Sequence, residues 1–498
     1  MSEGWVILGA MKKSKQVITA KFRRQTLAQR GLVAELDPQL LTAEQQKVAS
    51  LPIGSVALVV GCPAAGKSTA LKAWFLQLAR DHKPESIVAI AANRLAANKL
   101  RDELALAYQG ATLGPMARSI SSLAFSILRH DALERGAKLP ELISGSEQDA
   151  MLEEILERVA DDELEFPDFP EHIKKKTVLL SGFRNELRDL VAVAIERSIE
   201  PKDLHDLGVK HKKAEWVGAS KLYEYYLREL SLDVHSNRFD PSSLLVEATR
   251  LLREGIWPHQ LLNVKQFLID DAQELTPAAA AFIQALTENP SGARASVALF
   301  GDPDVATLAF RAADPEAMPK LAGGFATSLG RELHEIVLSP RESSHPAKIS
   351  AAMSRITPRI PVAGAGKQRK GLLPSDEDLA TDKSVKARVF TLQQEESAWI
   401  ANQLRKLNLN KEVPFSEMAV VARSVDELEE LEFALASESV PVRIVGAKSA
   451  LKDEFGSAAY LKLLRVVLQR PEIDFKLAVE LLSSPIGRFD ALTLRRLR

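Results

Sequence analysis

The stretch SVALVVGCPAAGKST, residues 55–69, decides how the chain around it is expected to fold. Residues 55–60 form a continuous apolar run, which is typical of a strand buried on both faces of a parallel sheet. Residues 61–68 match G-x-x-x-x-G-K-[ST], and a helical pattern follows them. A strand, a glycine-rich loop and a helix in this order predict a phosphate-binding loop in an α/β fold.

This loop would present its backbone N–H groups and the helix N-terminus to an anion. Lys67 would reach the β and γ phosphates of a nucleotide, and Ser68 would bind Mg²⁺. An accidental glycine-rich turn is the alternative, but the flanking strand and helix disfavour it. The predicted nucleotide-binding residues of the loop are Gly61, Cys62, Pro63, Ala64, Ala65, Gly66, Lys67, Ser68 and Thr69.

A second stretch, LIDDAQELTP at residues 268–277, places two aspartates directly after an apolar run. A phosphate-loop enzyme needs a carboxylate that holds Mg²⁺ at the end of another buried strand, and Asp270 has that position. A solvated turn is the alternative explanation of two adjacent aspartates. Beside a phosphate loop we expect a metal site, with Ser68 and Asp270 as its protein ligands.

On either side of these motifs, strand and helix patterns alternate, and a long helical segment interrupts this alternation. Residues 87–91 form another apolar run, with a helix expected from about Arg94. From 131 to 250, Glu, Leu and Lys recur at helical spacing, and strand patterns return in residues 264–270 and 295–302. We therefore predict an α/β domain, 41–130 and 251–330, that is interrupted by a helical insertion at 131–250.

A second α/β region is expected over residues 331–450. Its candidate strands are LHEIVLS at 333–339, ARVFTLQ at 387–393, FSEMAVVARS at 415–424 and VPVRIVG at 440–446. Residues 357–386 are rich in Pro, Gly and charge, which indicates a loop or linker. A helical pattern resumes near 457, so residues 451–498 are expected to begin a further helical domain.

The composition of the 498 residues is that of a globular protein of about three domains. No run of 18 apolar residues predicts a membrane span. The first apolar patch precedes its basic cluster, which is the reverse of a secretory signal. Cys62 is the only cysteine, so the chain can form neither an internal disulfide nor a cysteine-based zinc site. These features predict a cytoplasmic protein that has no membrane partner.

The formal net charge is −1, so a contact with nucleic acid must use local basic patches. One patch lies in residues 1–40, which we treat as a basic N-terminal extension. A solvated tail explains these charges equally well. The basic residues concerned are Lys12, Lys13, Lys15, Lys21, Arg23, Arg24 and Arg30.

The motifs, taken in order, resemble those of the UvrD/Rep-like superfamily 1 DNA helicases. The matching stretches are LTAEQQKV (41–48), GCPAAGKST (61–69), AANRLAANKLRDEL (91–104), ARSISSLAFSILR (117–129), IDDAQELTP (269–277), GDPDVATLAFRAADP (301–315), LSPRESS (338–344), EESAWIANQLR (395–405) and the segment 418–446. The resemblance implies two RecA-like domains, the second one incomplete here, with ATP and Mg²⁺ bound between them. It also implies a motor that moves 3′→5′ on single-stranded DNA and separates the duplex, in double-strand break repair or recombination.

The resemblance further implies a role for each residue that matches a family motif near the nucleotide. Gln45 matches a glutamine that contacts the adenine, Gln273 a sensor of the γ phosphate, and Arg341 an arginine finger. Asp271 stands where the family has a catalytic glutamate, which orients and activates water. Aspartate is one methylene shorter, so its carboxylate would sit back by about 1.5 Å. Misplacement by about one ångström can lower a rate about a hundredfold.

Four residues are implied to contact DNA. Phe310 matches an aromatic residue on which a base stacks, and Arg311 matches the arginine beside it. Base stacking of this kind contributes about 1–3 kcal/mol per base. Ser119 and Ser122 are candidates for contacts with DNA phosphates. A core aromatic residue is the alternative explanation of Phe310.

Several positions depart from the family pattern. Val305 replaces a glutamine, Leu308 a tyrosine and Ser121 a frequent histidine, while Ala91 and Ala92 replace a threonine and an aromatic residue. Each change removes a polar relay or a stacking surface, so weakened coupling between ATP and DNA is expected. The alternative to an active helicase is therefore a subunit that binds ATP and DNA with weak or no hydrolysis, as a scaffold in a two-motor complex.

Two stretches, LISGSEQDAMLEEIL (142–156) and LLSSPIGRFDALTLRRLR (481–498), are more specifically similar to actinobacterial AdnA/AdnB-type helicase–nuclease subunits. This similarity implies a hetero-oligomer with a second helicase–nuclease subunit. Family motifs V and VI are not found after Arg341, so we expect either a fragment of a longer protein or a degraded gene. An unrelated phosphate-loop enzyme, such as a small-molecule kinase, would need neither Gln45 nor Arg341.

Overall fold

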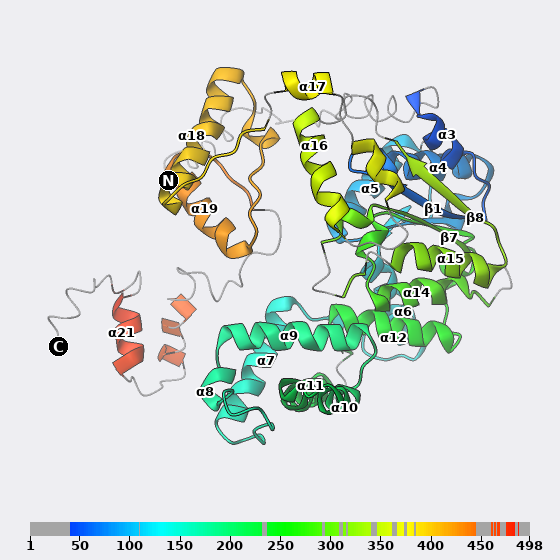
Figure 1. The fold of residues 1–498 in the computed structure, drawn as a ribbon. Helices are drawn as coiled ribbons and strands as arrows, with labels where there is room; N and C mark the ends of the chain where they lie inside the picture. Colours follow the sequence, from blue (N-terminus) through cyan, green and yellow to red (C-terminus); the bar gives the residue numbers. More distant parts are fainter. Residues whose placement is uncertain are drawn as a thin grey trace, which may run out of the picture. The chain divides into compact units, whose positions relative to one another are not determined.

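The computed structural model describes residues 40–444, with gaps, and short stretches beyond them. The gaps are at residues 109, 232–236, 291–293, 308–311, 315–316, 340–345, 361–365, 373–375 and 383–384. Beyond residue 444 the described residues are 460–461, 463–464, 466–468, 475–483 and 487. The chain divides into two compact units, Met1–Val385 and Lys386–Arg498 (Figure 1).

A six-stranded sheet with all neighbours parallel forms the centre of the first unit. Its strand order is β3-β2-β6-β7-β1-β8. The strands are β1 (Val56–Gly61), β2 (Ile87–Ala91), β3 (Ala117–Ser119), β6 (Gln266–Ile269), β7 (Ser296–Gly301) and β8 (Leu333–Leu338). Because all the strands run the same way, the loops that follow them meet at one edge of the sheet. The predicted α/β fold class is confirmed.

Successive side chains of the central strands enter two different hydrophobic cores, one on each face of the sheet. In β1, Val56 and Leu58 belong to one core and Ala57 and Val59 to the other. Such strands carry apolar residues on both faces, which is why they appear in the sequence as continuous apolar runs. The central strands are thus buried on both sides, and the loops at their ends are the parts that can carry a functional site.

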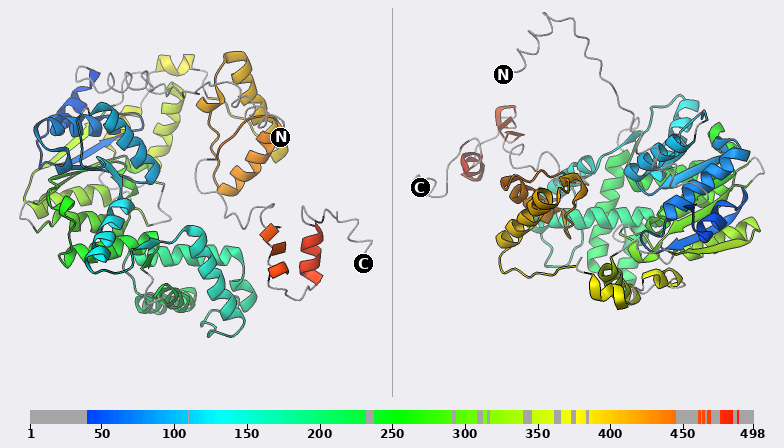
Figure 2. Two further views of the ribbon diagram at one scale, coloured as in Figure 1. Left: turned by 180° about the vertical axis from the view of Figure 1, so that it is seen from behind. Right: turned by 90° about the horizontal axis from the view of Figure 1, so that it is seen from above.

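Helices cover both faces of this sheet (Figures 1 and 2). One face packs against α3 (Ala43–Ala49), α4 (Lys67–Asp81) and α5 (Arg94–Ala107). The other packs against α6 (Ile120–Glu134), α12 (Pro241–Arg253), α14 (Pro277–Thr287) and α15 (Ala317–Leu329). The expected strand 87–91 and the helix start at Arg94 are both found. Asn93 caps that helix, because its side chain accepts a hydrogen bond from the Ala96 N–H at 2.9 Å.

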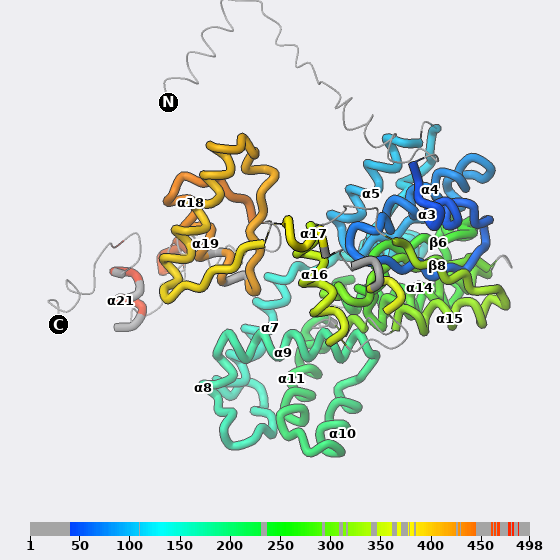
Figure 3. The backbone as a smooth tube through the Cα atoms, turned by 45° about the horizontal axis from the view of Figure 1, so that its top comes forward, coloured from blue at the N-terminus to red at the C-terminus, as the bar shows by residue number. Residues whose placement is uncertain are grey.

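A helical bundle is inserted between α6 and α12. It has its own core and consists of α7 (Gly145–Ala160), α8 (Lys175–Val178), α9 (Ser181–Glu196), α10 (Pro201–His211) and α11 (Ala214–Ser231), which gather together in Figure 3. The insertion was predicted to reach residue 250. Helix α12 instead packs on the sheet through Leu244, Leu251 and Leu252, so the bundle ends before it.

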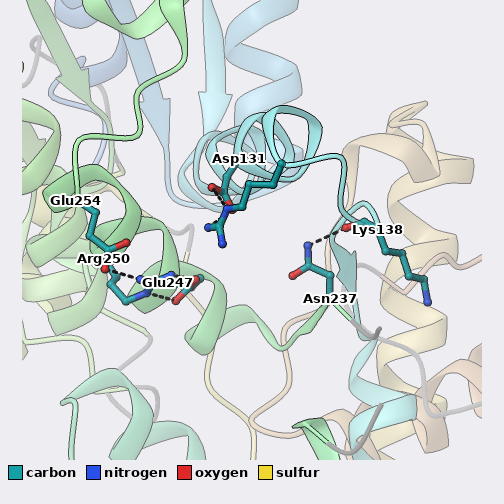
Figure 4. Close-up of polar contacts among 7 residues, drawn as sticks. Asp131, Lys138, Asn237, Glu247, Arg250 and Glu254 are labelled. Atoms are coloured by element: carbon teal, nitrogen blue, oxygen red, sulfur yellow. Dashed lines mark hydrogen bonds and ion pairs between the residues drawn. The ribbon is translucent and has the colours of Figure 1, made fainter. Parts of the chain in front are cut away.

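The insertion is joined to the sheet domain through a short two-stranded stem. Strands β4 (Glu141–Leu142) and β5 (Arg238–Phe239) pair in parallel. Asn237 closes the stem by donating its side-chain amide to the Lys138 carbonyl at 3.0 Å (Figure 4). Figure 4 also shows Arg250, which pairs with Glu247 and Glu254 and so supports the exposed side of α12.

Strand β8 corrects one prediction. Residues 333–339 were expected to begin the second α/β region, but Leu333–Leu338 pairs with β1 as the edge strand of the first sheet. The apolar pattern predicted a strand and could not show which sheet it joins. After β8 come α16 (Ala347–Ile356), η6 (Thr357–Arg359), η7 (Lys367–Leu372) and α17 (Asp376–Thr381).

The second unit contains α18 (Gln393–Lys411), η8 (Phe415–Glu417), α19 (Val425–Ser437) and α21 (Phe475–Ser483). Its small core is built on Ala401, Leu435 and Val440. The strands predicted at 387–393, 415–424 and 440–446 do not form a ladder among the described residues. Val389 and Val421 are more than nine-tenths exposed, since a strand pattern gains burial only when partner strands cover it.

None of the helices in the described ranges combines the length and apolarity that crossing a membrane requires.

Candidate active site

The loop between β1 and α4 has the backbone shape that a phosphate cradle requires. Gly66 caps α4 with a left-handed φ of 81°, a conformation that favours glycine. A Cβ atom on Gly66 would collide with the side-chain amide of Gln45, and one on Gly61 would lie 2.9 Å from the Ala65 Cβ. Ala64 is also left-handed, at φ 59°. Glycine at positions 61 and 66 is therefore required by the backbone conformation and by the close packing of the loop against Gln45 and Ala65.

Lys67 and Ser68 stand at the first turn of α4, beside the end of β6. The Lys67 Nζ donates to the carbonyl oxygens of Gly61 at 2.8 Å and Cys62 at 3.2 Å, so the ammonium lies over the loop itself. The Ser68 hydroxyl donates to the Asp270 Oδ2 at 2.8 Å. Residues 202 positions apart are thus brought together as the sequence predicted.

The Ser68–Asp270 pair has the chemistry of a Mg²⁺ site. A hydroxyl and a carboxylate are hard oxygen ligands, and Mg²⁺ usually binds one or two such groups together with phosphates and water. The pKa of Asp270 is raised to about 6, first by burial and then by the charge of Asp271, although the Ser68 hydrogen bond and the Lys67 charge oppose this rise. A divalent cation would relieve this crowding of negative charge.

Gln45 is buried against the loop from α3. Its side-chain Nε2 donates to the Ala65 carbonyl at 3.3 Å, and its Oε1 accepts from the Thr42 N–H at 3.0 Å in a capping box. The structure therefore shows Gln45 supporting the phosphate loop. Its implied contact with an adenine stays a prediction.

Asp271 follows the metal ligand in an unusual backbone conformation. Its φ is 51°, in the left-handed region, where short side chains such as Asp and Asn are tolerated better than longer ones. Its Oδ1 accepts from the Gln273 Nε2 at 3.3 Å. The side chain is therefore turned toward the predicted sensor, and its role toward water stays a prediction.

Gln273 links this segment to the end of β7. It lies in η3 (Ala272–Glu274), is buried, and its Oε1 accepts from the Asp302 N–H at 3.1 Å. Gly301 permits this approach, because a Cβ there would lie 2.6 Å from the Gln273 Oε1. A second link follows, since Glu274 accepts from the Thr307 N–H at 2.8 Å. The two motifs after β6 and β7 thus act as one hydrogen-bonded piece.

The structure adds functional candidates that sequence reasoning missed. Asp302 is almost fully buried, and burial raises its pKa while the charge of Lys67 lowers it. Asp304, in η4 (Pro303–Val305), pairs with the Arg369 Nε at 2.8 Å and Nη2 at 2.5 Å, and Gln368 lies against the same carboxylate. The GDPD motif could have indicated the two aspartates. No local signal marks Gln368 or Arg369.

Not all predicted residues can be placed in this site. Phe310, Arg311 and Arg341 lie outside the described residues, as does Leu308. The Ser119 hydroxyl caps α6 by accepting from the Ser122 N–H at 3.3 Å, which is a structural role at the end of β3. The Ser122 side chain is exposed there, and its contact with DNA stays a prediction.

The sequence profile of the UvrD/REP helicase N-terminal domain matches residues 41–326, which is more than half of the chain. The chain belongs to the UvrD/REP helicase family. The matched range contains the phosphate loop, the Ser68–Asp270 pair and the Gln273–Asp302 link. Arg369 lies beyond the matched range of this UvrD/REP domain.

The chain is also similar to a curated protein. The ATP-dependent DNA helicase srs2 of Schizosaccharomyces pombe is 25% identical over 248 residues, which are 49% of this chain and 26% of that protein. The chain thus matches about a quarter of the length of this relative.

Proposed function

We propose that the chain is the motor portion of an ATP-dependent DNA helicase, which couples ATP hydrolysis to 3′→5′ movement on single-stranded DNA. The observation that carries this proposal is the 2.8 Å contact between Ser68 and Asp270, which joins the phosphate loop to the carboxylate at the end of β6. Membership of the UvrD/REP family supports DNA as the partner. The polarity rests on the resemblance alone.

In the proposed mechanism, the backbone amides of residues 61–69 and Lys67 hold the phosphates of ATP. Ser68 and Asp270 would hold Mg²⁺, whose charge neutralises the phosphates when it is bound. Asp271 orients the attacking water, and Gln273 conveys the state of the γ phosphate to Asp302. Arg341 is proposed as the arginine finger, while Phe310 and Arg311 contact the DNA.

The proposed division into domains follows the family pattern. Residues 41–130 and 251–330 form the first RecA-like domain and 131–250 its insertion, with the bundle itself spanning α7–α11. Residues 331–450 form a partial second RecA-like domain, although β8 belongs to the first sheet. Residues 451–498 begin a second helical domain, and residues 1–40 are a basic extension.

A second candidate function is an ATP- and DNA-binding scaffold with weak or no hydrolysis. The observation that favours it is Asp271, whose short side chain is turned to Gln273 in a left-handed backbone. Such a subunit would serve in a two-motor helicase–nuclease of AdnA/AdnB type, acting in double-strand break repair with a second subunit.

ATP hydrolysis by the purified chain, with and without single-stranded DNA, tests the proposal. We expect DNA to stimulate turnover, and we expect Lys67→Ala to abolish turnover by removing a phosphate contact. Intact nucleotide binding without DNA-stimulated hydrolysis would favour the scaffold. Loss of both nucleotide and DNA binding in the wild type would overturn both candidates.

A further inference from the structure

Glu196, the last residue of α9, places a buried carboxylate between the helical insertion and the sheet domain. Its side chain is 7% exposed. The Oε1 accepts from the Ser242 hydroxyl at 3.1 Å, and the Oε2 accepts from the Ala278 N–H at 3.2 Å. The Thr276 hydroxyl is a third donor. One carboxylate of the insertion is thus bonded to the first turns of both α12 and α14.

The contact with α14 lies close to the nucleotide site along the chain. Helix α14 begins at Pro277, three residues after η3 ends with Glu274. Its first amides have no partner within the helix, and a negative charge there is favoured by the helix dipole. Thr276 accepts from the Ala279 N–H and Glu196 from the Ala278 N–H, so the insertion supplies one of the two caps.

Behind Glu196, a buried hydrogen-bond network continues into the core of the insertion. Asp240 accepts from the Ser242 N–H at 2.9 Å through one oxygen and from the Tyr226 hydroxyl at 3.0 Å through the other. Tyr226 in turn accepts from the Gln148 Nε2 at 3.0 Å. All these side chains are nine-tenths or more buried, which makes an unpaired member costly.

We infer that Glu196 is a positioning residue that couples the helical insertion to the segment carrying Asp271 and Gln273. The network from Gln148 to Ala278 is contiguous, and the backbone from Ala278 back to Gln273 connects it to the Gln273–Asp302 hydrogen bond at the end of β7. The inference rests on the proposed function, because it assigns Glu196 to the communication between bound DNA and the nucleotide.

Two variants weaken the contact between Glu196 and the first turns of α12 and α14 with little change in side-chain volume. Glu196→Gln removes the negative charge at the first turn of α14 and leaves one acceptor oxygen where the carboxylate had two, so its amide keeps Ser242 only by donating to that hydroxyl. Ser242→Ala removes the hydroxyl donor from the other side. Glu186→Gln is the matched control, because Glu186 is exposed on the same helix α9.

The contact between Glu196 and the first turn of α14 is tested by amide hydrogen exchange in the peptide that covers residues 272–287. We expect Glu196→Gln to speed exchange there about fivefold or more, with the remaining peptides of the sheet domain unchanged. Unchanged exchange in this peptide would overturn the inference.

The coupling is measured with a fluorescent, non-hydrolysable ATP analogue and Mg²⁺, titrated with and without a thymidine oligonucleotide. The ratio of the two affinities reports the coupling between the sites. We expect the effect of DNA on the affinity for the analogue to be about fivefold smaller in both variants than in the wild type. The affinity for the analogue without DNA should change less than about twofold. Glu186→Gln is expected to behave as the wild type.

The outcomes separate this inference from the proposed function. A wild-type ratio that DNA shifts, and that Glu196→Gln leaves unchanged, would overturn the inference alone. An equal loss of affinity with and without DNA would show a merely structural role and would overturn it too. A wild-type chain that shows neither DNA-stimulated turnover nor coupling would overturn the proposed function itself.

Discussion

Asp270 and Asp271 are adjacent in the chain but have different structural positions and different proposed roles. Asp270 directly follows β6 and accepts a hydrogen bond from Ser68, while Asp271 turns the chain into η3 with a left-handed φ of 51°. An L-residue pays about 1–2 kcal/mol in this region, and the short polar side chain of aspartate is tolerated there better than most. The left-handed backbone therefore gives a physical reason why aspartate stands at position 271, and a comparison of sequence motifs alone does not give this reason.

The first prediction concerns Asp271→Glu. The longer side chain moves its carboxylate outward by about 1.5 Å, to the reach expected of a catalytic glutamate. We expect DNA-stimulated kcat to rise by about tenfold to a hundredfold, with a small loss of stability from the left-handed backbone. Steady-state ATPase assays check this, with Asp271→Asn as the variant that removes the charge. A lower kcat in the glutamate variant would contradict the proposed role.

The second prediction concerns Gly66→Ala. The left-handed conformation costs a residue with a Cβ about 1–2 kcal/mol, and the new methyl group would collide with Gln45. We expect a loss of unfolding free energy of at least that size and a loss of nucleotide affinity. Urea unfolding and nucleotide titration check this. Gly114→Ala is the control, because nothing lies within 4 Å of a Cβ there, and it should behave as the wild type.

At the scale of elements, η7 binds the segment after β7 although the sequence indicated only a linker. Arg369 reaches Asp304 with two nitrogens, and the Asp304 side chain is 3% exposed. Arg369 also donates to the Ile360 carbonyl at 3.1 Å. A charge pair in this setting is costly to break from one side, because the remaining charge stays buried.

The third prediction is a double-mutant cycle on this pair. Arg369→Ala and Asp304→Ala are expected to show a coupling energy of about 1–3 kcal/mol in urea unfolding. The exposed pair Lys367–Glu335 offers the control, where the same cycle should give less than about 1 kcal/mol. Additive effects of the two substitutions at Arg369 and Asp304 would show that the pair does not hold the elements together.

The fourth prediction is a pH dependence carried by Glu196. Burial raises its pKa above the ordinary value of 4.5, and the charge of Asp240 raises it further, whereas hydrogen bonds from Thr276, Ser242 and Ala278 lower it. A carboxyl group whose pKa is raised by folding contributes stability that is fully present below about pH 4.5, the pKa of the unfolded state. This contribution is lost as the pH rises through the pKa of the folded state.

Urea unfolding of the wild type and Glu196→Gln checks this between about pH 7.5 and about pH 4.5. The wild type should gain stability relative to the glutamine variant as the pH falls over this window. A difference that stays constant, or that reverses in sign, would show that the pKa of Glu196 is not raised in the folded protein.

At the scale of the whole molecule, the sheet, its two cores and the insertion all lie within the unit Met1–Val385. The fifth prediction is that a chain ending at Val385 unfolds in one cooperative transition and binds nucleotide as the full chain does. We expect its DNA-stimulated hydrolysis to fall to background, because the truncated chain lacks the segments 395–405 and 418–446 that resemble the second motor domain of the family. Circular dichroism, nucleotide titration and ATPase assays check this. A non-cooperative transition would contradict it.

Much of the first unit could be predicted from local patterns. The strand at Ile87–Ala91, the start of α5 at Arg94 and the meeting of Ser68 with Asp270 all follow from apolar runs and phosphate-loop chemistry. The predictions were wrong where a strand pattern depended on partner strands that the local sequence does not specify. The strand at 333–338 joined a different sheet, and the apolar runs after residue 386 formed no ladder in the described residues.

The sequence by itself determined the phosphate loop, the carboxylate after β6 and the α/β class, because each depends on residues that are close together or on a fixed strand–loop–helix order. Only the tertiary structure decided that Glu196 caps α14 from the insertion and that Arg369 holds Asp304. These partners are 82 and 65 residues apart, and no periodicity encodes which buried charge meets which helix end. Such pairs follow from packing, which is a property of the whole fold.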